Sequence, residues 1–309
     1  MIVAVTGGAG FVGRALVARL AQAPGVSEIR VLTRHEAPAG TRAFQGDLTT
    51  GIPTQFLEGA DILYHCAGEL RREEAMRALH VDGTRRLVEA ASGRVPRWVQ
   101  LSSVGAYGRR NMDGSVSEDS PSEPDGEYEV TKAESDDLVQ RASASGAFAA
   151  ATLRPSIIFG PGMPNRSLAQ LIAVVQRGLF GRIGARPATA NYVYVDDIAD
   201  ALFRCGASAR ASGVYTLSDD RPMEDFIAAI AAALGRPAPT RRLPEGPLRL
   251  LARLGQRLPG FPLTESRIDA LTRNVRYPGR RIREQLGFTC AVSIEEGLRR
   301  YVASLRSRA

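Results

Sequence analysis

Short apolar runs alternate with longer amphipathic stretches through the first half of the chain, and this alternation limits the folds that the chain can adopt. Short apolar runs are typical of buried strands, and amphipathic stretches are typical of helices. In chain order the alternating segments are residues 2–6, 14–23, 29–33, 62–66, 76–91, 98–102, 128–143 and 150–154. The pattern predicts an α/β fold with a doubly wound parallel sheet, whose ligands lie beyond the carboxyl ends of the strands.

The second half of the chain predicts a smaller α/β unit, interleaved with the first. Gly160-Pro161-Gly162 and Pro164 form a cluster of turn residues that marks a boundary. A strand at residues 192–195 and a helix at 198–205 then return the chain to the sheet. Further helices are expected at residues 168–179, 224–234, 248–258 and 294–305. We assign the two units as residues 1–160 with 187–213, and residues 161–186 with 214–309.

The composition is that of an ordinary globular chain, with 44% hydrophobic and 24% charged residues among 309. No apolar run is long enough to span a membrane, and no basic segment precedes the apolar start of the chain. We therefore expect a cytoplasmic protein without a membrane span. Cys66, Cys205 and Cys290 stand singly, and the three histidines add no metal-ligand spacing, which predicts free buried thiols and no structural metal.

The chain carries 40 basic against 33 acidic residues, a formal charge of +7, and every basic residue except Lys132 is an arginine. Such a balance suits nucleic acid, an anionic membrane surface or a phosphorylated small substrate. No basic run reaches five residues and none is interleaved with aromatic residues, which disfavours nucleic acid. Most single arginines are expected on solvated helix faces.

A glycine-rich turn follows the first predicted strand and opens the first predicted helix. In the segment T-G-G-A-G-F-V-G at residues 6–13, Gly7 permits a tight turn and Gly10 allows the backbone to approach a pyrophosphate. Gly13 lets the helix pack on the strand, and Phe11 and Val12 lie at the helix N-terminus, which attracts phosphate. The segment predicts a dinucleotide site; the alternative is a tight turn without a ligand.

The end of the second predicted strand bears on which dinucleotide is bound. An NAD enzyme usually places an acidic residue there, but this chain has Thr33 and Arg34. Arg34 can pair with a 2′-phosphate, so we expect NADP, with NAD as the alternative. The interpretation of Arg34 without a cofactor is an arginine that faces solvent. Asp47 and Leu48 follow Gly46 where a side chain can accept the adenine amino group; the alternative for Asp47 is a turn or helix cap.

Tyr128 and Lys132 form the strongest local signal for catalysis. At positions i and i+4 of a helix their side chains share a face, so the ammonium can lower the pKa of the phenol toward neutrality. Such a phenol is a usable general base, and Lys132 is the single lysine of the chain. Ser103, just beyond the strand at 98–102, can hold the reacting oxygen. Ser102 is the alternative for that role. The interpretations without catalysis are that Ser103 only stabilises a turn and that Tyr128 and Lys132 are a surface pair.

Several motifs occur in one order along the whole chain. They are T-G-G-A-G-F-V-G at 6–13, G-D-L at 46–48, H-V-D-G-T at 80–84, L-S-S-V-G-A-Y-G at 101–108, Y-E-V-T-K at 128–132, L-R-P at 153–155, G-P-G at 160–162, Y-V-Y-V-D-D at 192–197 and L-G-F at 286–288. The chain thereby resembles the extended, epimerase/dehydratase-like branch of the short-chain dehydrogenase/reductase superfamily. The resemblance implies a Rossmann domain with a smaller C-terminal substrate domain. It also implies catalysis by Ser103, Tyr128 and Lys132, a Cys66-Ala67-Gly68 loop beside the cofactor ribose, and residues from Pro155 to Ile158 near the nicotinamide.

The chain departs from this family at three places. His80 stands where many relatives have asparagine, as part of a proton relay or as a packing residue. Val104 and Gly105 replace the acidic pair of sugar-nucleotide dehydratases, which disfavours dehydration. Ala190 replaces an arginine that grips a diphosphate in several relatives. Unranked candidates to take over that contact are Arg154, Arg166, Arg182, Arg186 and Arg273.

These features together predict an NAD(P)-dependent oxidoreductase acting on a secondary alcohol or ketone. The expected substrate is a nucleotide-activated sugar, and the expected reaction is 4-epimerisation or reduction of a 4-keto sugar. The alternatives are a reductase of steroid- or flavonoid-like alcohols and a non-catalytic dinucleotide-binding protein. Helices at 76–91 and 128–143 are candidates for a homodimer interface, and the amphipathic stretch 248–258 is expected to face a core rather than to anchor the chain in a membrane.

Overall fold

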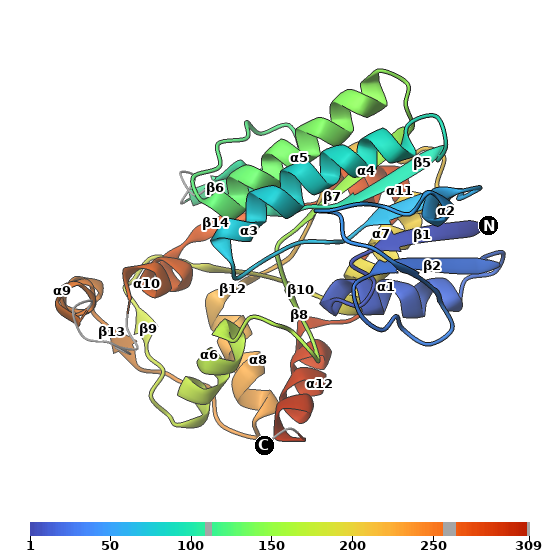
Figure 1. Cartoon of the computed structure of the whole chain (residues 1–309). Coiled ribbons are helices and arrows are strands. Elements are labelled where there is room, and N and C mark those ends of the chain that lie inside the picture. Colours follow the sequence, from blue (N-terminus) through green and yellow to red (C-terminus); the bar gives the residue numbers. More distant parts are fainter. Residues whose placement is uncertain (109–112, 256–263, 308–309) are drawn as a thin grey trace.

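The computed structural model describes residues 1–108, 113–255 and 264–307, and its centre is a seven-stranded parallel sheet (Figure 1). The order of strands across the sheet is β11-β7-β5-β4-β1-β2-β3. Their bounds are β1 Ile2–Thr6, β2 Glu28–Thr33, β3 Arg42–Gln45, β4 Ile62–His65, β5 Arg97–Leu101, β7 Ala149–Pro155 and β11 Gly213–Leu217. The predicted doubly wound parallel sheet is confirmed.

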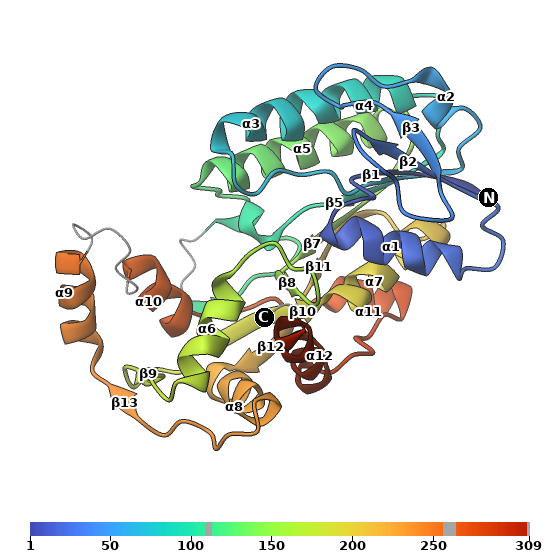
Figure 2. The same ribbon diagram turned by 60° about the horizontal axis from the view of Figure 1, so that its bottom comes forward.

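Helices cover both faces of the sheet, as Figures 1 and 2 show. On one face lie α2 (Thr54–Leu57), α4 (Thr84–Ala91) and α5 (Glu127–Ala144), and on the other lie α1 (Phe11–Ala21), α7 (Val195–Ala207) and α11 (Arg280–Leu286). Because both faces are covered, the central strands are continuous apolar runs, and Val3, Ala4 and Val5 are all fully buried.

The second lobe is built around a three-stranded sheet. Strand β10 (Thr189–Tyr194) lies between the parallel β8 (Ile157–Phe159) and the antiparallel β12 (Asp219–Pro222). Helices α6 (Ser167–Gln176), α8 (Met223–Ala233) and α12 (Ile294–Arg306) pack on it around one hydrophobic cluster.

Two strand pairs and two helices complete this lobe. Strand β13 (Arg242–Leu243) pairs with β9 (Arg182–Ile183), and β14 (Asn274–Arg276) pairs with β6 (Asp113–Ser115). Helices α9 (Glu245–Gly255) and α10 (Glu265–Thr272) contact each other at the edge of the lobe, at the left in Figure 1.

The return of the chain to the main sheet differs from the prediction. The predicted strand at 192–195 is β10, which belongs to the three-stranded sheet. The seventh strand of the main sheet is β11 instead, so the predicted domain boundary after residue 213 falls inside this strand. The chain does cross back into the first unit, but it does so through α7 and then β11.

The bounds of the predicted helices differ from the observed ones by up to three residues, and one predicted helix is not a single α-helix. The helix expected at 76–91 is α3 (Glu73–Arg77), a π-helical turn (Ala78–Gly83) and α4 in succession. The helix expected at 248–258 starts earlier, and the last three residues of that prediction lie outside the described residues.

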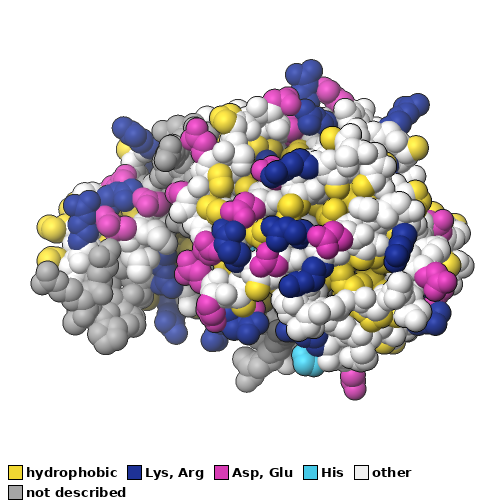
Figure 3. Space-filling view, turned by 45° about the horizontal axis from the view of Figure 1, so that its top comes forward, with side chains coloured by type: hydrophobic (Ala, Val, Ile, Leu, Met, Phe, Trp, Pro, Cys, Tyr) yellow, Lys and Arg dark blue, Asp and Glu magenta, His cyan; other side chains and the backbone are white. Residues whose placement is uncertain are grey.

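Helices α3, α4 and α5 and the π-helical turn present an outer face of mixed charge. Arg77 pairs with Glu134 at 2.8 Å, and Arg85 pairs with Asp82 at 2.7 Å. Figure 3 shows positive and negative side chains interspersed over the side of the molecule on which these helices lie. A homodimer interface on this face stays a prediction. Among the described residues, no helix is long and apolar enough to cross a membrane.

Candidate active site

A central cleft of about 640 Å³ opens where strands β1, β4, β5 and β7 end. Most of the residues predicted from the sequence for catalysis or cofactor binding line this cleft. They are Gly7, Gly10, Phe11, Val12, Gly13, Cys66, Ala67, Gly68, Ser103, Tyr128, Lys132 and Pro155. The topology therefore brings the glycine turn and the Ser–Tyr–Lys set to one edge of the sheet, as expected for parallel strands.

The glycine turn forms a cradle that side chains would fill. Gly7 has φ +70°, and a Cβ there would stand 2.6 Å from the nitrogen of Ala67. A Cβ on Gly13 would stand 2.0 Å from the oxygen of Gly7, so the start of α1 could not pack on the turn. Helix α1 also begins with neither a side-chain cap nor an acidic residue in its first turn. Its first N–H groups are thus suited to the pyrophosphate of a dinucleotide.

Ser103 is held by the short helix that follows β5. It caps the 3₁₀ turn Val104–Tyr107, and its Oγ accepts a hydrogen bond of 3.0 Å from the nitrogen of Gly105. This bond fixes the oxygen and leaves the hydroxyl proton free to be donated. The neighbouring Ser102 donates to Asp136 at 2.7 Å and is buried, which favours Ser103 over Ser102 as the residue facing a reacting oxygen.

Tyr128 lies at the start of α5, and the expectation of a lowered pKa for its phenol is wrong in this structure. Burial raises the pKa of Tyr128 to about 12, and the nearby Glu129 carboxylate acts in the same direction. A hydrogen-bonding interaction with Ser103 opposes the rise. The phenol is therefore protonated at neutral pH, in the form of a proton donor.

Lys132 is buried beside an internal ion pair. Its Nζ donates 2.6 Å to the carbonyl oxygen of Leu101. Burial lowers the pKa of Lys132, and the carboxylate of Asp136 acts against that. Asp136 itself accepts a hydrogen bond of 2.9 Å from Arg154, and both side chains are almost fully buried. One buried carboxylate thus faces two buried cations.

His80 joins the wall of the cleft to helix α5. Its Nε2 accepts 2.8 Å from the backbone N–H of Glu69, and its Nδ1 lies 2.9 Å from Thr131 Oγ1. The backbone donor fixes the tautomer, because the proton must then sit on Nδ1 and point to Thr131. The ring packs edge-on against Tyr128 at 5.7 Å. Of the two readings of His80, the structure favours packing and positioning over a proton relay.

Burial also makes His80 a source of acid sensitivity. Burial lowers its pKa from 6.5 to about 3, so the folded protein excludes a proton that the unfolded chain binds below about pH 6.5. The free energy of unfolding should therefore fall as the pH drops from about 6.5 toward 3. His80→Gln should lose less stability than wild type between pH 7 and pH 5 in urea unfolding. If wild type and His80→Gln lose the same unfolding free energy, His80 does not contribute to the acid sensitivity.

Three residues predicted for the adenosine end do not line the central cleft. The guanidinium of Arg34 lies 3.4 Å from Asp47, and its side chain is 59% exposed. Asp47 Oδ1 accepts from both the nitrogen and the hydroxyl of Thr49, as a turn aspartate does. Leu48 is buried in the hydrophobic cluster between the sheet and helices α2, α4 and α5. Their roles toward a cofactor stay predictions.

The sequence missed one side of the cleft. Two loops line it that were not assigned to the site, Glu69 to Arg71 and Gly162 to Asn165, and they meet where Arg71 donates 2.8 Å to the oxygen of Pro164. Leu70 and Ile157 also line the cleft and are 55% and 44% exposed. The only signal in the sequence was the turn cluster at 160–164, which was interpreted as a boundary.

The five arginines proposed to replace the missing diphosphate contact lie in different settings. Arg154 is buried in its pair with Asp136, and Arg182 pairs with Glu224. Arg273 has a buried Nε without a hydrogen-bond partner in the part of the chain that is described. Arg166 and Arg186 are exposed. None of the five lines the central cleft.

The three cysteines are free. Cys205 is buried as expected, whereas Cys66 and Cys290 are half-buried. Burial raises the pKa of each thiol to about 12, so none is a thiolate at neutral pH. Within the residues that the structure describes, no group of histidine, cysteine, aspartate and glutamate could hold a metal ion.

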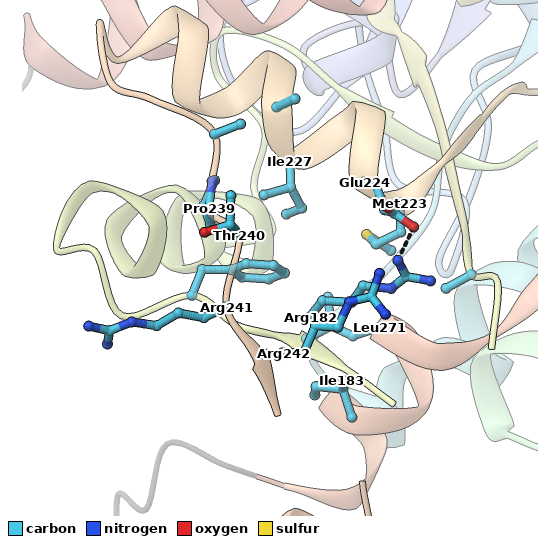
Figure 4. Close-up of a pocket in the computed structure, with 14 residues that line it drawn as sticks. Arg182, Ile183, Met223, Glu224, Ile227, Pro239, Thr240, Arg241, Arg242 and Leu271 are labelled. Atoms are coloured by element: carbon cyan, nitrogen blue, oxygen red, sulfur yellow. Dashed lines mark ion pairs between the residues drawn. The ribbon is translucent and has the colours of Figure 1, made fainter. Parts of the chain in front are cut away.

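A second pocket of about 300 Å³ lies in the smaller lobe, between α8, β9 and the segment that leads to β13. It shares no residue with the central cleft. Arg182, Arg241 and Arg242 stand at its rim over an apolar floor (Figure 4). This pocket could not be predicted from the sequence, because its walls come from four separate segments.

The fold and the central cleft define a class: nucleotide-binding enzymes of the Rossmann type, with a glycine cradle and a Ser–Tyr–Lys set at one sheet edge. Comparison with known proteins then gives the family. The model of the NAD dependent epimerase/dehydratase family matches residues 3–217, and the chain belongs to this family. It is an NAD(P)-dependent enzyme of the extended short-chain dehydrogenase/reductase type.

Individual relatives differ in what they act on. A dTDP-6-deoxy-L-talose 4-dehydrogenase (NAD(P)(+)) from Kitasatospora kifunensis is 32% identical over 70% of this chain and 73% of its own length. A 4-hydroxy-2-methyl-3-oxo-4-farnesyl-3,4-dihydroquinoline-1-oxide ketoreductase from Stigmatella aurantiaca is 28% identical over 95% and 93%. The UDP-glucuronic acid 4-epimerase from Bacillus cereus, solved with NAD, is 17% identical with a TM-score of 0.78 over 100% and 99%, a likeness of fold.

Proposed function

We propose that the protein reduces the ketone of a nucleotide-activated sugar at the 4-position, or epimerises that carbon, with NADP as the preferred cofactor. The observation that carries the proposal is the convergence of Ser103, Tyr128 and Lys132 with the glycine cradle in one cleft. Family membership supports oxidoreductase chemistry at a secondary alcohol or ketone.

Each of the three side chains has a chemical role in this proposal. Bound NAD(P) supplies or accepts a hydride. Tyr128 donates its phenolic proton to the reacting oxygen during reduction, or takes it back during oxidation. Ser103 donates a hydrogen bond to the same oxygen, since its own oxygen is already fixed by Gly105. Lys132 is buried one helical turn after Tyr128. Its positive charge favours the tyrosinate that is left after proton donation.

In the direction of ketone reduction Tyr128 acts in its protonated form, whereas in the direction of alcohol oxidation it must first lose its proton. A phenol with a pKa of about 12 is protonated at neutral pH and is ready to donate. A reductase must also exchange its cofactor, and the Thr33–Arg34 end of β2, which lacks an acid, supports NADP.

A nucleotide-activated sugar is supported by the names of several relatives and by the charge of the smaller lobe. The segments 161–186 and 214–309, without helix α11 that covers the main sheet, hold 18 basic and 9 acidic residues, a net charge of +9. A diphosphate is drawn to such a field. We expect saturating UDP-, dTDP- or GDP-sugars to raise the Tm of the cofactor-loaded protein; no response to any of the three would exclude this substrate class.

A second candidate is reduction of an apolar ketone, and a specific observation favours it. The substrate side of the cleft presents Leu70 and Ile157 to solvent, beside Val104 and Met163. Exposed apolar side chains in a cleft are suited to an apolar ligand. NADPH oxidation with a steroid-like ketone, together with no response to nucleotide sugars, would select this candidate.

Arg34 gives a test of the cofactor. Arg34→Ala should weaken binding of NADP by about 10- to 100-fold, the value of a charge-assisted hydrogen bond, and should change NAD binding little. Quenching of protein fluorescence by each dinucleotide measures both affinities. Arg42→Ala, which removes an exposed arginine paired with Glu28 on the neighbouring strand, is the matched control. If the affinities for NADP and NAD fall equally, Arg34 does not contact the 2′-phosphate.

A further inference from the structure

Helix α9 has two apolar faces, and only one of them is covered. Leu248 and Ala252 face the core of the lobe, where they pack with Ile183 and Ile268. Leu250, Leu251 and Leu254 are instead 60%, 49% and 65% exposed. Three exposed leucines within five positions of one helix form a patch rather than scattered surface residues. The sequence prediction that this stretch faces a core accounts for only half of the helix.

Unpaired positive charge lies on the segment that leads into α9. Strand β13 leads directly into α9, and Arg241 and Arg242 are exposed; neither forms an ion pair with any described residue. Figure 4 shows the side chain of Arg241 extending away from the pocket, while Arg242 lies beside Arg182. The arginines on α9 itself are already neutralised, since Arg249 pairs with Glu245 and Asp269, and Arg253 with Glu265.

The positive charge is also concentrated on this lobe as a whole. Against the +9 of this lobe, the rest of the chain, α11 included, carries 22 basic and 24 acidic residues, a net charge of −2. The molecule is therefore electrically polar, with the exposed leucines on the positive part. An anionic surface is therefore attracted to the lobe that carries the exposed leucines.

We propose that the α9 surface, defined as Arg241, Arg242, Leu243, Leu250, Leu251 and Leu254, docks on an anionic lipid bilayer. Leu243 is 36% exposed and completes the apolar part. The helix lies in the plane of the bilayer surface, its leucines enter the boundary of the acyl chains, and the two arginines contact lipid phosphates. This mode of binding needs no membrane-spanning helix.

A second copy of the chain is a poorer occupant for this surface. A two-fold contact places the same patch on both sides, so Arg241 and Arg242 of each copy would face their own counterparts or lie close to them. Among the described residues, no carboxylate forms an ion pair with either arginine. Lipid phosphates supply the missing negative charge, and the bilayer supplies the apolar medium for the leucines.

Sedimentation with lipid vesicles tests the proposal on the full chain. We expect the protein to sediment with vesicles that contain phosphatidylglycerol and not with vesicles of phosphatidylcholine alone. Leu250→Ser with Leu254→Ser should abolish binding, and Arg241→Gln with Arg242→Gln should weaken it about 25-fold, about fivefold for each charge. The matched control is Arg94→Gln with Arg210→Gln, which removes two exposed arginines from the other domain.

Several results would overturn the proposal. They are equal sedimentation with both vesicles, no sedimentation with either, and unchanged binding by the leucine or the arginine pair of substitutions. Analytical ultracentrifugation of the same variants gives a further one. If the leucine substitutions convert a wild-type dimer into a monomer, the face is a contact between copies and the bilayer proposal is wrong. Circular dichroism confirms that the variants are folded.

Discussion

Replacing Tyr128 with phenylalanine should lower kcat/KM for ketone reduction by about 10²- to 10⁴-fold, the usual contribution of a positioned proton donor. The substitution removes one oxygen from a side chain that lines the cleft beside Ser103. Binding of the dinucleotide should change little, because the aromatic ring and its edge-on contact with His80 remain. Steady-state kinetics with NADPH, together with the Kd for the dinucleotide, separates the two effects.

The matched control for this substitution is Tyr64→Phe. The Tyr64 hydroxyl is also buried and has no hydrogen-bond partner in the described part of the chain, but it lies in β4 away from the cleft lining. Its loss should leave kcat unchanged. If Tyr128→Phe retained full kcat/KM on a substrate identified by the thermal shift, Tyr128 would not be the proton donor and the catalytic proposal would fail.

The parts of the fold that the sequence predicted are those in which local pattern and burial agree. Strand β1 is a continuous apolar run because helices cover both sides of it. Strand β3, in contrast, is an edge strand whose residues are mostly exposed, so Arg42–Gln45 carried no apolar signal. The placement of β10 depended on its partners. Its apolar residues suit either sheet, and only tertiary pairing with β8 and β12 decides.

The candidate site shows the same division between local and tertiary information. Residues that follow directly on strands, such as Gly7 and Ser103, were predictable because the topology sends every parallel strand to one edge. The loop from Gly162 to Asn165 was not, since it reaches the cleft through a contact with Arg71, distant in sequence. Helical spacing placed Lys132 on the face of Tyr128. It could not show that Lys132 would donate to Leu101 or that the phenol would be buried.

Removing the carboxylate of Asp136 should be the most destabilising single change near the site. Asp136 is 1% exposed, and it lies between Arg154, at 2.9 Å, and Lys132, whose protonated form it favours. Asp136→Ala leaves both cations buried without their counter-charge, which costs about 3–5 kcal/mol of unfolding free energy. Urea unfolding at neutral pH measures the loss. Activity should fall as well, since an uncompensated Lys132 tends to release its proton.

Asp136 faces two cations, whereas Arg154 faces one carboxylate, and this difference gives a second test. Arg154→Met removes one cation but leaves Asp136 opposite Lys132, so it should cost less than Asp136→Ala. Combining Asp136→Leu with Arg154→Met removes both members of the ion pair and replaces them with apolar volume, which often restores stability. The double variant should therefore recover only part of the stability that Asp136→Ala loses, because Lys132 stays buried without its counter-charge. If Asp136→Ala and Arg154→Met cost the same, Asp136 serves Arg154 alone, and Lys132 is held in place by its bond to Leu101 without the carboxylate.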